Sequence, residues 1–263
     1  MNSIIKKFLC KVSFIFLLCA VFWHPAEAAS LRLEASIPIP RGYVVQGFCY
    51  NSASHRFLLA AKTPWDTGDR ATQIIMVLRP GSFARERTYQ FHDLGHINTL
   101  TYQPEENVIY VVTGGAKWHE YAKVDADSMT VLEKNVCPNS FYAMAYDAAR
   151  EEYVQCTLHK NTYVFTRYDQ NMELKKKFRV KTAYRIGNGL AAHEGELLMF
   201  ALPPEGSNYG GLEIVDKDGA LAISQKVPQE IELEDADYVD GKIYIAANNW
   251  KDRNATIYSY QRE

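Results

Sequence analysis

Four side chains that offer oxygen ligands recur along the sequence at wide, nearly regular intervals: Gln46, Asn98, Asn188 and Glu234. Amide and carboxylate oxygens suit a hard cation such as Ca²⁺, which takes about six to eight oxygen ligands. If folding brings these four side chains together, they predict a calcium site. The alternative is a polar surface whose amide groups are satisfied by ordered water.

Two aspartates, Asp235 and Asp237, follow Glu234 and replace small residues at the equivalent positions of the other repeated segments. Buried carboxylates are unfavourable unless they are paired, hydrogen-bonded or bound to a metal. These acids are therefore the best candidates for acid or base chemistry, and Asp235 and His96 are the candidate catalytic residues. The alternative is that the aspartates accept hydrogen bonds from backbone amides or pair with Arg185.

Tryptophan is the third feature, because the three that follow the N-terminal apolar segment all stand in loop-like segments rich in Gly, Pro or Asn. Exposed tryptophans usually contact something, and an indole beside amides and acids suits a sugar or a peptide. The alternative is that each indole packs over the edge of its own sheet. The predicted ligand-binding residues are Trp65, Asp66, Trp118, His119, Tyr209, Asn249 and Trp250.

A repeated strand pattern must position these residues. Similar strand-like segments end at Tyr50, Tyr102, Tyr146, Ala192 and Tyr238, which are 52, 44, 46 and 46 residues apart. No long stretch shows helical periodicity, and such a period is typical of the four-stranded blade of a β-propeller. Each repeat contains four strand-like segments, except that the fifth ends before its fourth.

Residues 31–39 form one further strand-like segment, which precedes the first repeat. We expect this strand to complete the fifth blade beside the C-terminal strand, with Leu31, Leu33 and Ile37 buried, because closure of the ring removes an exposed sheet edge. The sequence thus predicts an all-β fold, a five-bladed β-propeller of four-stranded antiparallel blades closed by the N-terminal strand. In such a ring the four oxygen-bearing side chains would meet at the mouth of the axial channel, on the face that carries the tryptophan loops.

The first 28 residues are interpreted as a cleaved signal peptide. Lys6, Lys7 and Lys11 precede the largely apolar residues 12–23, and residues 26–28 form a small-x-small cleavage pattern. An apolar run this short does not cross a bilayer as a helix. We therefore expect a propeller domain over residues 29–263, no membrane span in the mature chain, and a secreted or periplasmic location.

Along residues 30–263 the repeats resemble those of the extracytoplasmic propellers of the broad YVTN/gluconolactonase-like superfamily. That superfamily includes calcium-dependent lactonases, lyases, lectins and binding scaffolds, so the resemblance implies a location and a binding face but no particular reaction. Gluconolactonase-like propellers hold calcium in a similar axial place with acidic and Asn ligands. They have more blades, and Gln46 stands here where an acid would bind calcium more strongly.

Composition limits the choice of function. The formal net charge of −2 gives no field for nucleic acid, and no nucleophile elbow, Walker loop or dinucleotide fingerprint is found. The first hypothesis is a monomeric, non-catalytic binding protein that engages a glycan, a peptide or a small polar ligand on its loop-rich face. The alternative is a calcium-dependent hydrolase or lyase of lactonase type. The three cysteines of the mature chain, Cys49, Cys137 and Cys156, are expected to be thiols.

Overall fold

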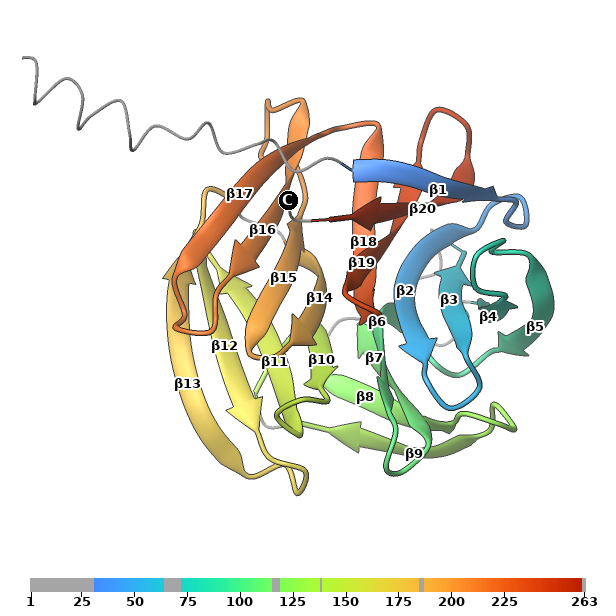
Figure 1. Cartoon of the computed structure of the whole chain (residues 1–263), viewed down its shortest axis with the longest axis horizontal. Helices are drawn as coiled ribbons and strands as arrows, with labels where there is room; N and C mark the ends of the chain where they lie inside the picture. The colour runs from blue at the N-terminus through green and yellow to red at the C-terminus, as the bar shows by residue number, and fades with distance from the viewer. Residues whose placement is uncertain (1–30, 64–71, 115–118, 138, 185–186, 262–263) are drawn as a thin grey trace, which may run out of the picture. The chain divides into compact units, whose positions relative to one another are not determined.

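The chain folds into a ring of five blades. The computed structural model describes residues 31–63, 72–114, 119–137, 139–184 and 187–261. In the compact unit Leu31–Tyr260 the described residues form twenty strands in five separate four-stranded antiparallel sheets, with no helix among them. The first strands of successive blades contact one another around the ring, and the last blade contacts the first (Figure 1). The predicted five-bladed β-propeller is confirmed.

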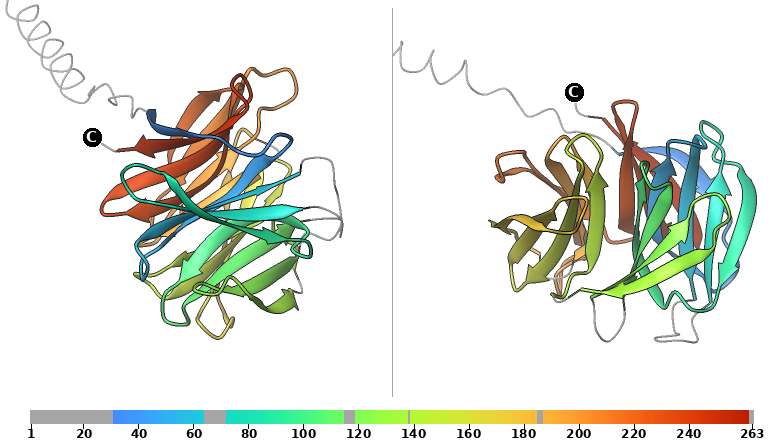
Figure 2. Two further views of the ribbon diagram at one scale, coloured as in Figure 1. Left: turned by 90° about the vertical axis from the view of Figure 1, so that its right-hand side faces the viewer. Right: turned by 90° about the horizontal axis from the view of Figure 1, so that it is seen from below.

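Within each of the first four blades, chain order runs from the inner strand to the outer strand (Figures 1 and 2). Blades 1 and 2 are β2 (Val44–Asn51), β3 (Arg56–Lys62), β4 (Gln73–Leu78) and β5 (Arg85–Phe91), then β6 (His96–Gln103), β7 (Val108–Gly114), β8 (Glu120–Asp125) and β9 (Val131–Val136). Blades 3 and 4 are β10 (Ala143–Asp147), β11 (Glu152–His159), β12 (Thr162–Tyr168) and β13 (Leu174–Lys181), then β14 (Gly187–His193), β15 (Glu196–Ala201), β16 (Tyr209–Val215) and β17 (Leu221–Pro228). Blade 5 is β18 (Ile231–Val239), β19 (Lys242–Asn249), β20 (Asn254–Tyr260) and β1 (Leu31–Ile37).

The N-terminal strand closes the ring as the sequence predicts. Strand β1 pairs antiparallel with β20, from Leu31 opposite Tyr260 to Ile37 opposite Ala255. The expectation that Leu33 is buried is wrong, because its side chain is 56% exposed. A β-bulge between Leu33 and Ala35 reverses the alternation of side chains along β1, so Ala35 and Ile37 pack against the core while Leu31 is only partly buried.

The hydrophobic core lies between facing blades, since each blade packs one side of its sheet against its neighbour. Ile37, for example, packs with side chains of blades 5 and 1, whereas Cys49 belongs to the cluster between blades 1 and 2. Cys49 and Cys156 are buried, Cys137 is partly buried, and all three are free thiols. Cys156 lies opposite Ala143 on β10, so its partner across the strand pair is not Cys137.

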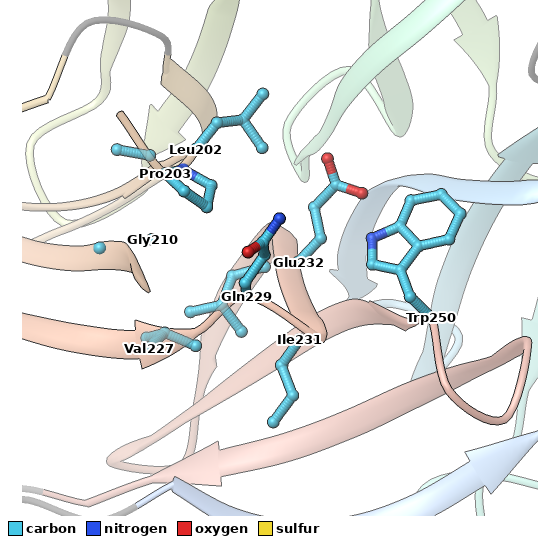
Figure 3. Close-up of a pocket in the computed structure, with 11 residues that line it drawn as sticks. Leu202, Pro203, Gly210, Val227, Gln229, Ile231, Glu232 and Trp250 are labelled. Atoms are coloured by element: carbon cyan, nitrogen blue, oxygen red, sulfur yellow. The ribbon is translucent and has the colours of Figure 1, made fainter. Parts of the chain in front are cut away.

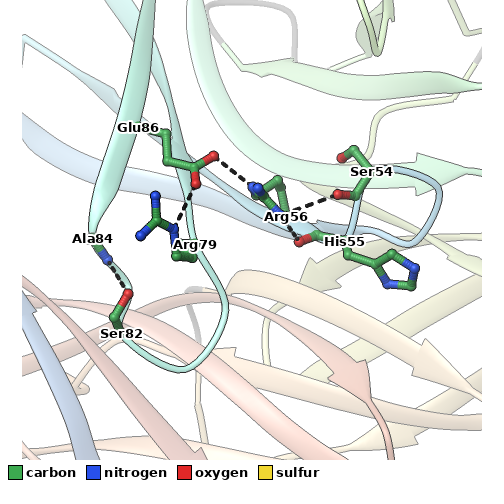
Figure 4. A network of polar contacts seen from close by, with 7 residues as sticks. All are labelled: Ser54, His55, Arg56, Arg79, Ser82, Ala84 and Glu86. Carbon is green, nitrogen blue, oxygen red and sulfur yellow. Dashed lines mark hydrogen bonds and ion pairs between the residues drawn. The ribbon is translucent and has the colours of Figure 1, made fainter.

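An ion-pair network holds the outer part of blade 1 together (Figure 4). Glu86 on β5 accepts hydrogen bonds from Arg56 Nε at 2.6 Å and from Arg79 Nε at 2.9 Å. These two arginines favour the ionised carboxylate and lower the pKa of Glu86. Exposed pairs of this kind contribute little to the free energy of folding, so the network orders the outer strand without setting the stability of the ring.

Candidate functional site

The inner strands of four blades begin with an irregularity in their pairing, and polar residues occupy it. The register shifts between Val45 and Phe48, between Ile97 and Thr99, between Gly187 and Leu190, and between Leu233 and Asp235. A bulge at the start of a strand changes the direction of the extra side chain and releases it from the alternation of the sheet. The polar residues within these four shifts are Gln46, Asn98, Asn188 and Glu234.

These four side chains line one cavity of about 290 Å³. The structure thus brings together the residues that the sequence singled out as oxygen ligands, and it adds His96 to them. The inner strands β2, β6, β14 and β18 supply these five side chains and also Val44, Gly187 and Glu232. The other lining residues are Lys62, Leu202, Asn248 and Trp250. We call this space the mouth cavity.

Two carboxyl groups lie together in the mouth cavity. Glu234 is 4% exposed, and its carboxyl oxygens accept hydrogen bonds from Asn248 Nδ2 at 2.6 Å and from Gln46 Nε2 at 3.3 Å. Burial raises the pKa of Glu234 well above its ordinary value, and the charge of Glu232 adds to this effect. Burial also raises the pKa of Glu232. A hydrogen bond between the two carboxyls favours a protonated Glu234 beside an ionised Glu232.

Lys62 and His96 complete the titratable groups of the mouth cavity. The Lys62 side chain is 3% exposed at the end of β3. Burial, together with the positive charge of Lys62, lowers the pKa of His96 to about 4. His96 is therefore neutral near pH 7, so its ring offers one donor and one acceptor. The cavity combines an ammonium group, a neutral imidazole, a carboxyl pair and several amides.

Trp250 separates the mouth cavity from two neighbouring hollows. Its side chain is 50% exposed in the loop between β19 and β20, and it lines all three spaces. One hollow, of about 210 Å³, is also lined by Leu202, Pro203 and Glu232 (Figure 3). The indole nitrogen lies on the side of Trp250 that faces Glu232. A hydrogen bond between the indole N–H and the Glu232 carboxyl favours the ionised form of that carboxyl.

The donor set fits a calcium ion poorly. The side-chain nitrogens of Asn98 and Asn188 donate to the backbone oxygens of Tyr142 and Leu233, which leaves their amide oxygens available, but Glu234 is engaged by two amides and by Glu232. The buried Lys62 brings a positive charge into the same cavity. Within the described ranges, no group of three or more His, Cys, Asp or Glu side chains has the geometry to hold a metal ion. Calcium at Gln46, Asn98, Asn188 and Glu234 therefore stays a prediction.

Asp235, proposed above as a catalytic residue, lies outside the cavities. Its side chain is fully buried, and Oδ2 accepts hydrogen bonds from the backbone amides of Phe48 at 2.8 Å and Leu100 at 2.9 Å. Asp237 likewise accepts from the backbone amide of Tyr50 at 2.7 Å. The structure therefore shows the alternative in which both aspartates bind backbone amides between blades, and it gives Asp235 no access to a ligand.

The remaining predicted ligand-binding residues are dispersed. Tyr209 is 47% exposed at the start of β16, with the Lys226 ammonium 5.8 Å from its ring centroid. Asn249 holds its own loop, because its Oδ1 accepts from the backbone amide of Lys251 at 3.0 Å. His119 lines none of the three hollows. The predictions for Trp65, Asp66, Trp118 and Arg185 lie outside the described residues.

Sequence reasoning missed two titratable residues of the mouth cavity, Lys62 and Glu232. Both carry a usable signal. Lys62 ends a strand of buried residues directly before a predicted loop, where a charged side chain is expected at the rim. Glu232 stands two residues before Glu234, and strand periodicity predicts that residues at this spacing share a face.

Neither a protein-family model nor a curated protein matches the sequence. Solved structures resemble it in fold. The tail fiber of Staphylococcus aureus phage P68 has a TM-score of 0.59 at 10% identity, over 89% of this chain and 53% of that one, so this chain spans about half the length of the tail fiber chain. A luciferin-regenerating enzyme has a TM-score of 0.53 at 11% identity, over 89% of this chain and 95% of that one.

A third structure, of a nidogen/laminin complex, has a TM-score of 0.51 at 10% identity, over 86% of this chain and 91% of that one. The names of these structures describe a viral fiber, an enzyme and a complex between two proteins. Sequence identities this low show a shared fold alone, because one fold carries many unrelated functions. By fold, the chain is a β-propeller.

Proposed function

We propose that the chain is a secreted or periplasmic binding protein whose mouth cavity takes one sugar unit of a glycan. The observation that carries the proposal is the joint lining of this cavity by Trp250, the carboxyl pair and the amides of Gln46, Asn98, Asn188 and Asn248. Sugar hydroxyls both donate and accept hydrogen bonds, and the apolar face of a sugar ring packs on an indole. At about 290 Å³ the cavity is near the lower end of small-molecule sites, which suits one ring.

Gln46 supplies a further reason to expect a ligand hydroxyl. Its Oε1 atom is buried and accepts no hydrogen bond from the described residues, while its Nε2 donates to Val45 O at 2.7 Å. A buried amide oxygen without a donor is unfavourable by about 1–3 kcal/mol. A hydroxyl group in the mouth cavity would relieve this cost, and Glu232 would accept a second hydroxyl nearby.

Isothermal titration of the mature chain with soluble oligosaccharides and envelope peptides tests this proposal. Trp250→Ala should weaken glycan binding about tenfold or more, since stacking on one aromatic side chain contributes about 1–3 kcal/mol in comparable sites. Glu232→Gln should also weaken binding, because it removes a carboxylate that would accept a sugar hydroxyl. Leu174→Ala is the matched control, since this side chain is 65% exposed on the outer strand β13, away from the cavity. Wild-type affinity in Trp250→Ala would disprove the glycan site.

A hydrolase or lyase of lactonase type is the second candidate, and one observation favours it. His96, Glu232 and Glu234 line the same cavity and all have shifted pKa values, which is common at catalytic sites. A panel of lactones and esters, assayed with and without a chelator, tests this function. Turnover that is lost in His96→Ala and Glu232→Gln would support catalysis in the cavity, whereas an inactive wild-type protein would exclude these substrates.

A further inference from the structure

A second hollow, of about 740 Å³, lies on the other side of Trp250, where the closing N-terminal segment meets blade 5. One wall is the connection between β1 and β2, and the other is the loop between β19 and β20. Ile39, Pro40, Tyr43 and Trp250 make most of its surface apolar. We call this space the closure hollow, and the functions proposed above do not use it.

Two arginines, Arg41 and Arg253, line the closure hollow from opposite walls. Both side chains are exposed, and neither guanidinium has a hydrogen-bond or ion-pair partner among the described residues. No Asp or Glu is among the lining residues. The neighbouring Asp252 is engaged elsewhere, because its Oδ2 accepts a hydrogen bond from Asn249 Nδ2 at 3.0 Å. The hollow therefore combines apolar walls with two unneutralised positive charges.

Both arginines stand on well-defined turns. Tyr43 N donates to Pro40 O at 3.0 Å, and Gly42 has a φ of +85°, which places Arg41 at the corner of a tight turn. The third position of a type II turn requires such a positive φ, which glycine adopts without strain. On the other wall, Arg253 N donates to Asn249 O at 2.8 Å, and Arg253 itself has a φ of +55°. Preformed turns reduce the entropy lost when a ligand is held.

From this geometry we infer that the closure hollow is a second ligand site, for an organic acid with a flat apolar body and a carboxylate. The apolar body would lie between Tyr43 and Trp250, and the carboxylate would take the guanidinium groups of Arg41 and Arg253. Arginine suits this role because its planar fork binds a carboxylate through two parallel hydrogen bonds. The site differs from the mouth cavity in its charged groups, since two carboxyl groups line the mouth cavity and none lines the closure hollow.

Isothermal titration of the full mature chain with 2-naphthoate and with neutral 2-naphthamide tests the inference. The naphthoate should bind about tenfold or more tightly than the amide, because charge-assisted hydrogen bonds are about twice as strong as neutral ones. The double variant Arg41→Gln/Arg253→Gln should bind naphthoate only as weakly as naphthamide. Tyr43→Ala should weaken both compounds, because it removes a wall of the hollow.

Arg85→Gln is the matched control, since Arg85 is an exposed arginine on the outer strand β5, outside the hollow. It should leave the affinity for naphthoate unchanged. Equal affinities for the acid and the amide, no binding of either, or unchanged binding by the double variant would each overturn the inference. Glu232→Gln separates this site from the proposed glycan site, because Glu232 lines the mouth cavity and not the closure hollow, so the variant should weaken glycan binding and leave naphthoate binding intact.

Discussion

The junction between blades 2 and 3 and the junction between blades 5 and 1 have the same backbone geometry but different chemistry. In both, the inner strand of one blade presents side-chain oxygens to backbone amides of the next inner strand. Between blades 2 and 3 the oxygens are hydroxyls: Thr99 Oγ1 accepts from Met144 N at 3.2 Å, and Thr101 Oγ1 accepts from Tyr146 N at 2.8 Å. Each hydroxyl satisfies one amide of the neighbouring blade.

Where the ring closes, carboxyl groups stand in place of these hydroxyls. Asp237 accepts from Tyr50 N, and Asp235 accepts from the amides of both Phe48 and Leu100. Asp235 therefore connects blade 5 to blade 1 and to blade 2, which no single threonine hydroxyl does at the other junction. The difference shows that an acid in the wall of a propeller can serve closure of the ring, at the cost of making that closure depend on pH.

The largest expected effect comes from removing the closing strand itself. Deletion of residues 30–39 should expose the edge of β20 and the apolar surface that Ile37 covers, since Ile37 is only 4% exposed. At about 25 cal/mol per Å² of apolar area, this loss is comparable with the whole free energy of unfolding of a domain, about 5–15 kcal/mol. We expect aggregation or a much lower Tm, measured by thermal unfolding with light scattering.

The control for this deletion removes only residues 1–28. The resulting mature chain should have the same Tm as the full chain. The junction between blades 2 and 3 contains no part of the deleted segment, so the deletion changes only the closure of the ring. A deletion protein that melts like the intact mature chain would show that β1 contributes nothing to closure.

Single substitutions at the two junctions should have a smaller effect on the free energy of unfolding. The size of the effect should follow the number of backbone amides from which each side chain accepts a hydrogen bond. Asp235→Ala leaves the amides of Phe48 and Leu100 without an acceptor, whereas Thr101→Val leaves only that of Tyr146. Because an unsatisfied buried donor costs about 1–3 kcal/mol, we expect Asp235→Ala to lower the free energy of unfolding by about twice as much as Thr101→Val. Urea unfolding near neutral pH measures both. Asp235→Asn, which keeps an acceptor oxygen, should recover most of the loss; equal losses in the two single variants would remove the distinction.

The fold was predictable because its signals are local and occur five times. Strand alternation and turn residues repeat in each blade, and the one unpaired strand, residues 31–39, had a single free edge to join. The exposure of Leu33 was not predictable in this way. It depends on a bulge in β1, and one inserted residue reverses which side chains face the core.

The candidate site was only partly predictable. Gln46, Asn98, Asn188 and Glu234 could be found because a polar residue interrupts an apolar strand at the same place in four repeats. The burial of Lys62 depends on a cavity that several blades form together, and no local pattern encodes it. The role of Asp235 was uncertain for the same reason, because the amides that it binds belong to other blades.

The smallest expected effect is a difference in pH dependence between the two junctions. Burial raises the pKa of Asp237 from 3.8 to about 6, even though two backbone amides, of Tyr50 and Tyr238, favour its ionised form. The folded chain therefore binds this proton more tightly than the unfolded chain. Between about pH 4 and about pH 6 the unfolded chain has already lost this proton, whereas the folded chain still holds it. The free energy of unfolding therefore falls as the pH rises through this range, compared with that of a variant without the acid.

Asp237→Asn isolates this effect, because the asparagine keeps an acceptor oxygen and does not titrate. The difference in free energy of unfolding between Asp237→Asn and the wild type should shift in favour of the variant as the pH rises across this window. The shift should reach at most about 3 kcal/mol, since each unit of pKa is about 1.4 kcal/mol and Asp237 keeps partial contact with solvent. Urea unfolding at a series of pH values between about 4 and 8 measures it. Thr101→Val, the change at the equivalent position between blades 2 and 3, should differ from the wild type by the same amount at every pH. A constant difference for Asp237→Asn as well would mean that both junctions respond to pH alike.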